Sequence, residues 1–172
     1  MKSKEIKNLA VSAVCLALCV VFPMLFHSIP NGGSIFLPMH IPVLLCGLLC
    51  GGIYGGICGA AGPLISSLAT GMPPMAMLPS MMTECFTYGL VAGFLIKSLK
   101  GKAAFKLYFS LVSAMLLGRV VSGLVSSYIF MSGNSPFAWI GASLLTGLPG
   151  IAAQLLLVPL LYFGLKKAGL AK

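Results

Sequence analysis

The sequence predicts an all-α integral membrane protein, a bundle of six transmembrane helices with both termini in the cytoplasm. Of its 172 residues, 59% are hydrophobic and only 8% are charged. The mean hydropathy of +1.06 lies outside the range of soluble domains. Apolar runs near the length that crosses a bilayer recur along the chain, and lysines gather where such runs end. We therefore expect one membrane domain over residues 1–172.

The positive charge of the chain indicates membrane topology and not a nucleic-acid partner. The formal net charge is +9, and ten of the eleven basic residues lie in three clusters. These are Lys2, Lys4 and Lys7; Lys97, Lys100, Lys102 and Lys106; and Lys166, Lys167 and Lys172. The positive-inside rule places such clusters in the cytoplasm. Both termini and the loop around residues 97–106 are thus predicted inside.

The first predicted span, residues 8–26, carries small residues on one face. Ala10, Ala13 and Ala17 recur at i, i+3 and i+7, and small residues let a second helix approach closely in lipid. The run is too long for a signal-peptide core and lacks a convincing cleavage site, so we expect it to be retained. Residues 27–39 then read as an external loop.

Residues 40–71 could form one long span or two short ones. Gly47, Gly51, Gly55 and Gly59 repeat every four residues, as on one continuous helix. The neighbouring glycine pairs favour a turn, however. Two spans, at 40–53 and 55–70, also give the even number of crossings that keeps the first two lysine clusters on one side. We therefore predict two spans.

The remaining spans are expected at residues 79–97, 104–131 and 138–165. An external loop precedes them and contains Met72, Pro73, Pro74, Met75 and Met77. A polar external turn around Asn134 separates the last two spans. A kink is predicted at Pro149–Gly150 in the final span.

Glu84 and Arg119 are the only charged side chains inside the predicted spans. Such groups cost about 2.5–3.5 kcal/mol at the bilayer centre, so they usually face a cavity or a partner. Glu84 would lie about 9 Å and Arg119 about 18 Å below the outer surface, given the helical rise. A direct ion pair then requires the arginine to reach upward. Either the two residues form a salt bridge that holds the helices together, or one or both contact a polar ligand.

Each of these charges belongs to a polar stripe along its helix. Ser80, Glu84 and Tyr88 align on the fourth span. Arg119, Ser122 and Ser126 align on the fifth. Two such stripes on otherwise apolar helices predict facing walls of a polar pocket.

Five further residues are candidates to contact a substrate, each with a plain structural alternative. His40 lies at the outer end of the second span and could be a capping residue. Tyr128 and Trp139 lie where an aromatic belt is expected, and Asn134 could simply shape its turn. Gln154, deep in the last span, needs a hydrogen-bond partner and is either structural or pocket-lining.

The sequence carries no motif of an enzyme and no cofactor-binding signature. It has no nucleotide-binding loop, catalytic triad, paired-carboxylate site or HExxH motif, and it contains no Asp. Its six cysteines lie in apolar segments and read as small buried hydrophobes. The spacing of Met72, Met75 and Met77 could hold Cu(I), but chance clustering of ten methionines or an apolar lid over a pocket is the favoured explanation.

Several local features occur together in this chain. They are the Ala13–Ala17 AxxxA pair, the run Pro38-Met39-His40-Ile41-Pro42, the loop Thr70-Gly71-Met72-Pro73-Pro74, Glu84 with Tyr88-Gly89, and the segment from Leu148-Pro149-Gly150 to Gln154. In these features the chain resembles the substrate-binding S components of energy-coupling factor (ECF) vitamin transporters.

The resemblance implies high-affinity binding of a vitamin or related molecule near the outer side of a prokaryotic plasma membrane. It implies that Ala10, Ala13 and Ala17 dock onto a membrane-embedded coupling subunit driven by two ABC-type ATPases. It implies toppling of the S component in the membrane, with residues 71–79 as the gate. His40, Glu84, Tyr88 and Arg119 become pocket candidates, together with Ser122, Tyr128, Asn134, Trp139 and Gln154.

Two departures from the binding sites of known family members narrow the range of possible substrates. Thiamine-binding members resemble one another in a tryptophan-containing aromatic site, and Trp139 is the only tryptophan here. Nickel and cobalt members use a free amino terminus followed by histidine, whereas Met39-His40 is internal. Pantothenate, folate, pyridoxine, cobalamin and a queuosine precursor stay open, and Arg119 favours a carboxylate. The alternatives to this function are a stand-alone copper permease and a membrane scaffold without a ligand.

Overall fold

The computed structural model describes residues 3–26, 28–29, 31–130 and 136–169, and within these ranges the chain is helical without strands. The helices are α1 (Ser3–Leu25), α2 (Gly32–Phe36), α3 (His40–Cys50), α4 (Gly52–Thr70), α5 (Leu78–Ser98), α6 (Ala103–Phe130), α7 (Pro136–Thr146) and α8 (Leu148–Lys167). The predicted all-α class is confirmed for this part of the chain.

Five segments in the described part are long and apolar enough to cross a membrane. They are Lys4–Leu25, Gly32–Cys50, Gly52–Thr70, Ala103–Tyr128 and Leu148–Lys167. Helix α5 is not among them although it has 21 residues, because Glu84 and its polar neighbours lower the hydropathy of its first half. The count of six spans and the orientation of the termini stay predictions.

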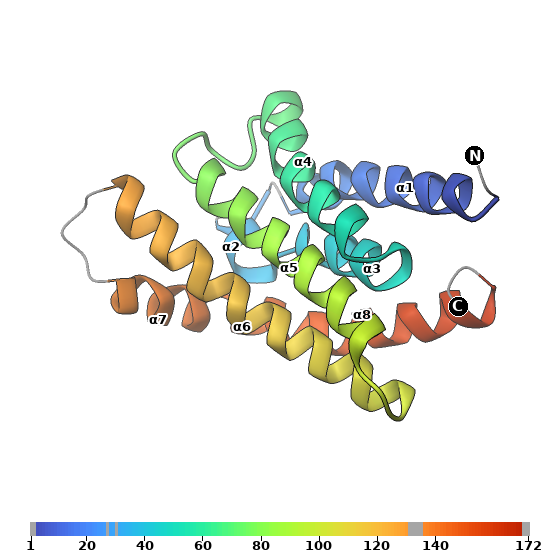
Figure 1. The fold of residues 1–172 in the computed structure, drawn as a ribbon. Coiled ribbons are helices and arrows are strands. Elements are labelled where there is room, and N and C mark those ends of the chain that lie inside the picture. The colour runs from blue at the N-terminus through green and yellow to red at the C-terminus, as the bar shows by residue number, and fades with distance from the viewer. Residues whose placement is uncertain (1–2, 27, 30, 131–135, 170–172) are drawn as a thin grey trace.

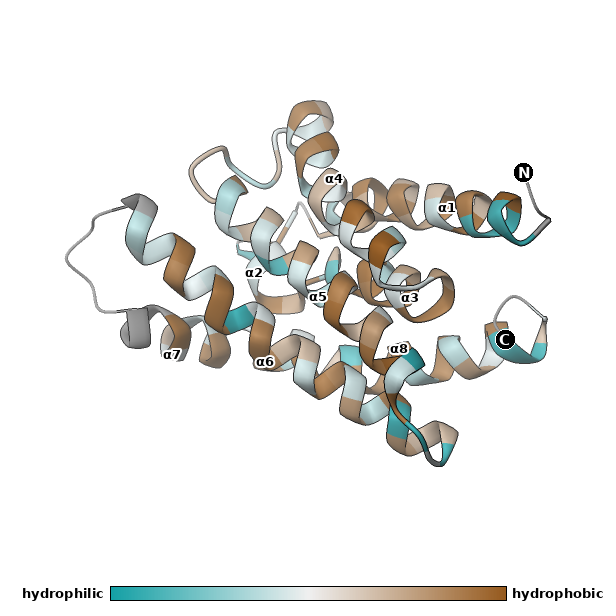
Figure 2. Ribbon diagram, viewed as in Figure 1, coloured by the Kyte–Doolittle hydropathy of each residue, from teal (hydrophilic) through white to brown (hydrophobic). Residues whose placement is uncertain are grey.

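Helices α3 and α5 form the centre of the bundle. Helix α5 packs against α3, α4 and α6, and α1 covers α3 and α4 on the other side (Figure 1). Nearly all residues of α3 are buried. The outward faces of the surrounding helices carry exposed apolar side chains such as Val14, Ile53 and Leu156 (Figure 2). An apolar outer surface around buried polar side chains is the arrangement expected of a helical bundle in lipid.

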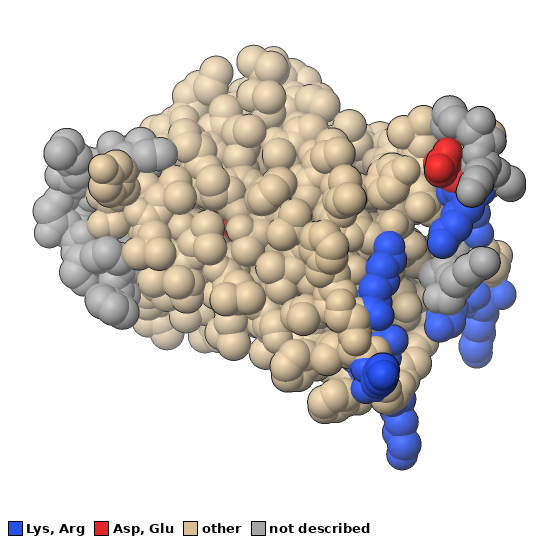
Figure 3. Space-filling model, viewed as in Figure 1, with Lys and Arg blue, Asp and Glu red and all other residues tan. Residues whose placement is uncertain are grey.

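The lysines gather at one end of the molecule. Helix α1 begins there and α8 ends there (Figure 1), and Lys7 donates a hydrogen bond to the carbonyl of Gly169. The α5–α6 connection brings its lysines to the same end (Figure 3). This one-sided distribution is the pattern expected from the positive-inside rule.

The glycine stripe on residues 47–59 lets α3, α4 and α5 touch through their backbones. A Cβ atom on Gly59 would lie 2.2 Å from the carbonyl oxygen of Cys85, and one on Gly89 would lie 2.2 Å from that of Gly55. On Gly47 it would lie 2.4 Å from the oxygen of Gly89. Sequence reasoning found the stripe but missed Gly89 of α5 as its partner.

The break predicted within residues 40–71 occurs at Gly51. Its φ of 109° lies in the region that favours glycine, and α3 ends and α4 begins on either side of it. Residues 40–70 therefore form two helices, and the turn lies at Gly51, three residues before the predicted boundary. That each helix crosses the membrane stays a prediction.

Two predictions about local structure are wrong. The expected external loop contains helix α2, which packs against α8; a Cβ on Gly150 would lie 2.7 Å from the backbone of Phe36. The final segment is broken at Gly147 into α7 and α8 and does not form one helix kinked at Pro149. Pro149 stands in the first turn of α8, where its missing N–H costs no hydrogen bond.

Replacing Gly89 with alanine is expected to destabilise the bundle by about 1–3 kcal/mol, because the added methyl group forces α4 and α5 apart. Gly164 of α8 is the matched control, since a Cβ there meets no atom within 4 Å. The midpoint of thermal denaturation in detergent measures both variants. Equal midpoints for Gly89→Ala and Gly164→Ala would contradict the observed backbone contact.

Candidate functional site

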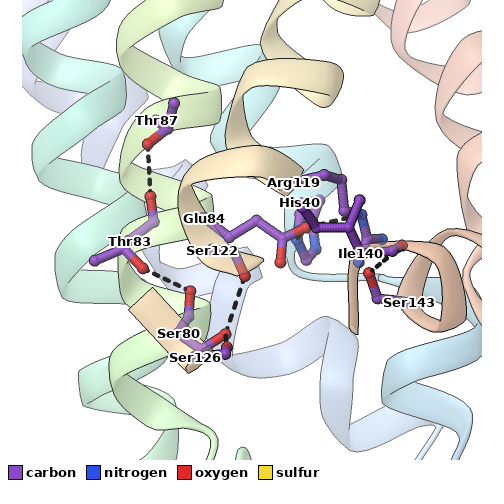
Figure 4. A network of polar contacts seen from close by, with 10 residues as sticks. All are labelled: His40, Ser80, Thr83, Glu84, Thr87, Arg119, Ser122, Ser126, Ile140 and Ser143. Atoms are coloured by element: carbon purple, nitrogen blue, oxygen red, sulfur yellow. Dashed lines mark hydrogen bonds and ion pairs between the residues drawn. The ribbon is translucent and has the colours of Figure 1, made fainter. Parts of the chain in front are cut away.

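A buried ion pair joins three helices in the middle of the bundle. Glu84 Oε1 of α5 lies 3.3 Å from His40 Nε2 of α3 and 3.2 Å from Arg119 Nε of α6 (Figure 4). His40, Glu84 and Arg119 are 1%, 5% and 4% exposed. A buried charge is tolerated only when it is paired, so each of these residues depends on the others.

The close approach of the helices explains why these side chains meet. Tyr88 lies one turn after Glu84, and its ring occupies the space that a Cβ on Gly118 of α6 would fill. The same ring packs edge-on against His40, with the ring centroids 5.0 Å apart. Glu84 and Arg119 therefore form a direct ion pair. This is one of the two alternatives that the sequence left open.

Several polar atoms around the ion pair are buried without a hydrogen-bond partner among the residues that the structure describes. They are His40 Nδ1, Tyr88 Oη, Arg119 Nη2 and both amide atoms of Gln154. The contacts at Glu84 Oε1 also have ion-pair distances without the angles of hydrogen bonds. Each unsatisfied buried group costs about 1–3 kcal/mol. A polar ligand that reached these atoms would recover part of that cost.

A chain of serines connects the two predicted polar stripes. Ser80 and Ser122 lie 3.0 Å apart, and Ser126 donates a hydrogen bond of 2.9 Å to Ser80 (Figure 4). All three are buried. The stripes therefore face each other, as the sequence predicts. Ser122 already has a partner on α5, and its contact with a substrate stays a proposal.

Arg119 also lies against the junction of α7 and α8. A Cβ on Gly147 would be only 2.8 Å from Arg119 Nη2 and 3.0 Å from the carbonyl oxygen of Ser143. The helix break thus makes room for the guanidinium group. Sequence reasoning missed this role of Gly147 because it predicted a continuous helix there, and the local Gly-Leu-Pro-Gly run is the signal that indicates a break.

The remaining candidates are placed differently. Tyr128 is 88% exposed on α6 and does not join the buried cluster. Gln154 is fully buried on α8, a helix that packs against α3 and α6. Asn134 and the side chain of Trp139 lie outside the described residues.

The methionine-containing loop is tied to the end of α4. Ser66 Oγ donates to the carbonyl oxygen of Met72, and Ser67 Oγ donates to that of Pro73, both at 2.7 Å. The side chains of Met72, Met75 and Met77 are exposed. The two serines are a feature that the sequence reasoning did not single out.

The small-residue face of α1 is exposed in the described part of the bundle. Ala10, Ala13 and Ala17 are all exposed, whereas Cys15 and Cys19 on the opposite face are buried. The alanines therefore present a surface on which another helix could pack closely.

A double-mutant cycle on Glu84 and Arg119 measures how strongly the two side chains stabilise each other. Glu84→Gln or Arg119→Gln alone is expected to destabilise by roughly 3–5 kcal/mol, because each leaves a buried charge unpaired. The double variant is expected to recover much of that loss. Thermal denaturation measures all three, with Glu5→Gln as the exposed-acid control. Simple addition of the two single effects would contradict coupling of the pair.

A family model described as the substrate-specific component of ECF transporters matches residues 7–162. No curated protein and no solved structure matches the chain.

Proposed function

Because the chain belongs to the family of ECF transporter substrate-specific components, we propose that it binds a vitamin or related small molecule with high affinity for ATP-driven uptake. Members of this family are transporter subunits and not enzymes. The family does not favour a stand-alone copper permease or a scaffold without a ligand.

The buried cluster of His40, Glu84 and Arg119 carries the proposal of where the substrate binds. A purely structural ion pair would be expected to satisfy its own donors and acceptors. Here Arg119 Nη2 and Tyr88 Oη have no partner among the described residues. Glu84 lies in the second turn of α5, at the end of that helix far from the lysines. The proposed site is therefore on the outer side of the membrane.

The charges of the cluster suggest the chemistry of the ligand. Glu84 already compensates one positive charge at Arg119 Nε, while Nη2 remains a free donor. A carboxylate or another electron-rich polar group would accept from this nitrogen in a charge-assisted hydrogen bond. Gln154 could both donate and accept if the ligand reaches α8. The lone Trp139 argues against a thiamine-type aromatic site.

The loop of residues 71–77 is the proposed gate over this site. It connects α4 to α5 just before Ser80 and Glu84, and Ser66 and Ser67 hold its backbone. Exposed methionines are flexible apolar side chains suited to closing over a ligand. Opening would break the two serine contacts.

Native mass spectrometry of the detergent-purified protein, taken directly from cells grown in rich medium, tests the proposed function. We expect a bound mass that matches a vitamin-sized molecule, and the same compound should raise the midpoint of thermal denaturation of the emptied protein. Arg119→Gln should abolish this rise, whereas Tyr128→Phe should keep it. A copper adduct lost on replacing Met75, or no shift with any compound of a broad vitamin panel, would contradict the proposal.

The alanine face of α1 is the proposed docking surface for a membrane-embedded coupling subunit that works with two ABC-type ATPases. Ala17→Leu should abolish uptake by the full transporter while ligand binding by the isolated protein is unchanged, because the larger side chain keeps the partner helix away. Ala152→Leu, at an exposed position of α8, is the control. Uptake at the wild-type rate by Ala17→Leu would show that this face does not dock.

A further inference from the structure

A basic recess opens at the lysine-bearing end of the bundle. It has a volume of about 700 Å³, and its walls come from α1, α3, α5, α6 and α8. Five lysines line it: Lys4, Lys7, Lys97, Lys106 and Lys166. Other lysines of the same end, namely Lys100, Lys102 and Lys167, are not among the lining residues. Only some of the lysines at this end of the molecule therefore line the recess.

The charges around this recess are not balanced by carboxylates of its own wall. None of the described lining residues is acidic. Lys97 Nζ donates to the carbonyl oxygen of Cys50 at 3.4 Å, and Lys7 Nζ donates to that of Gly169; both acceptors are neutral. The chain has only two acids. Glu84 belongs to the buried cluster, and Glu5 lies on α1 at the lysine-bearing end, but neither lines the recess. Five like charges converging on one hollow favour an anionic occupant.

An apolar groove lies next to the recess. It has a volume of about 430 Å³ and lies between α1, α3 and α8. Every described lining residue is apolar, including Val14, Leu18 and Leu161. Leu49 lines both the recess and the groove. The basic recess and the apolar groove therefore share one lining residue.

We propose that the recess and the groove form one binding site for an anionic phospholipid. The lysines hold the phosphate group, and one acyl chain lies in the groove between α1 and α8. Basic hollows between transmembrane helices on the cytoplasmic side suit anionic headgroups, and the predicted topology places this end in the cytoplasm. Ala10 also lines the groove, so the lipid lies beside the alanine face of α1.

The headgroup half of the site is tested by lipid titration of the delipidated protein, followed by native mass spectrometry. The wild type should bind phosphatidylglycerol in preference to phosphatidylcholine. The double variant Lys97→Gln/Lys106→Gln should lose this preference, with an affinity for phosphatidylglycerol lower by about tenfold or more. The control Lys100→Gln/Lys102→Gln removes the same charge from the same loop without touching the recess and should bind like the wild type.

The acyl-chain half is tested with two valines of α1. Val14→Trp fills the groove and should weaken binding of phosphatidylglycerol, whereas Val21→Trp, at a position that is also exposed but outside the groove, should not. Inorganic phosphate and glycerol 3-phosphate should fail to displace the lipid. Displacement by either anion, equal binding of the two lipids, or equal losses in the lysine variants and their control would overturn the proposal.

Unchanged lipid binding with loss of uptake in Lys97→Gln/Lys106→Gln would overturn it too and would indicate a protein partner at the recess instead. Binding of the vitamin-type substrate is a separate readout, so failure of one proposal does not decide the other.

Discussion

A single carboxylate buried in an apolar bundle is the constraint on which the rest of the structure depends. Glu84 is held between His40 and Arg119, which come from two other helices. Loss of either neighbour would leave a buried charge without compensation. The glycine contacts among α3, α4 and α5, the Tyr88 ring in the space beside Gly118, and the helix break at Gly147 all bring backbone close enough for these three side chains to meet.

The two ends of the molecule differ in the side chains that they bury and expose. The half of α5 far from the lysines carries Glu84 of the cluster, and the loop that precedes this half is bonded to Ser66 and Ser67. The opposite end gathers the lysines around a recess. Between them the outward surface is apolar, with small residues on α1. A subunit that captures a polar molecule, sits in lipid and passes its cargo to a partner needs these three surfaces and no catalytic machinery.

Much of this architecture follows from periodicity, and what does not follow has identifiable physical causes. Helical spacing predicts the two facing stripes that contain Glu84 and Arg119, and the glycine pair predicts the turn at Gly51. Periodicity defines the face of a helix but not its axial offset from its neighbours, so the pairing could be stated only as an alternative. His40 reads as a capping residue because only the tertiary packing of α3 against α5 brings it to Glu84. The break at Gly147 is missed because Pro149 by itself fits both a kink and the first turn of a helix, and only the flanking glycines favour the break.

A structure of the protein with its natural ligand bound would decide whether the buried cluster binds the substrate. We expect the ligand to lie against the cluster, with a polar acceptor within hydrogen-bond distance of Arg119 Nη2 and the loop of residues 71–77 closed over it. We also expect Tyr88 Oη or Gln154 to gain a partner. A ligand bound elsewhere in the bundle, with the contacts of Glu84 to His40 and Arg119 unchanged and their neighbours still unpartnered, would show that the ion pair only holds the helices together.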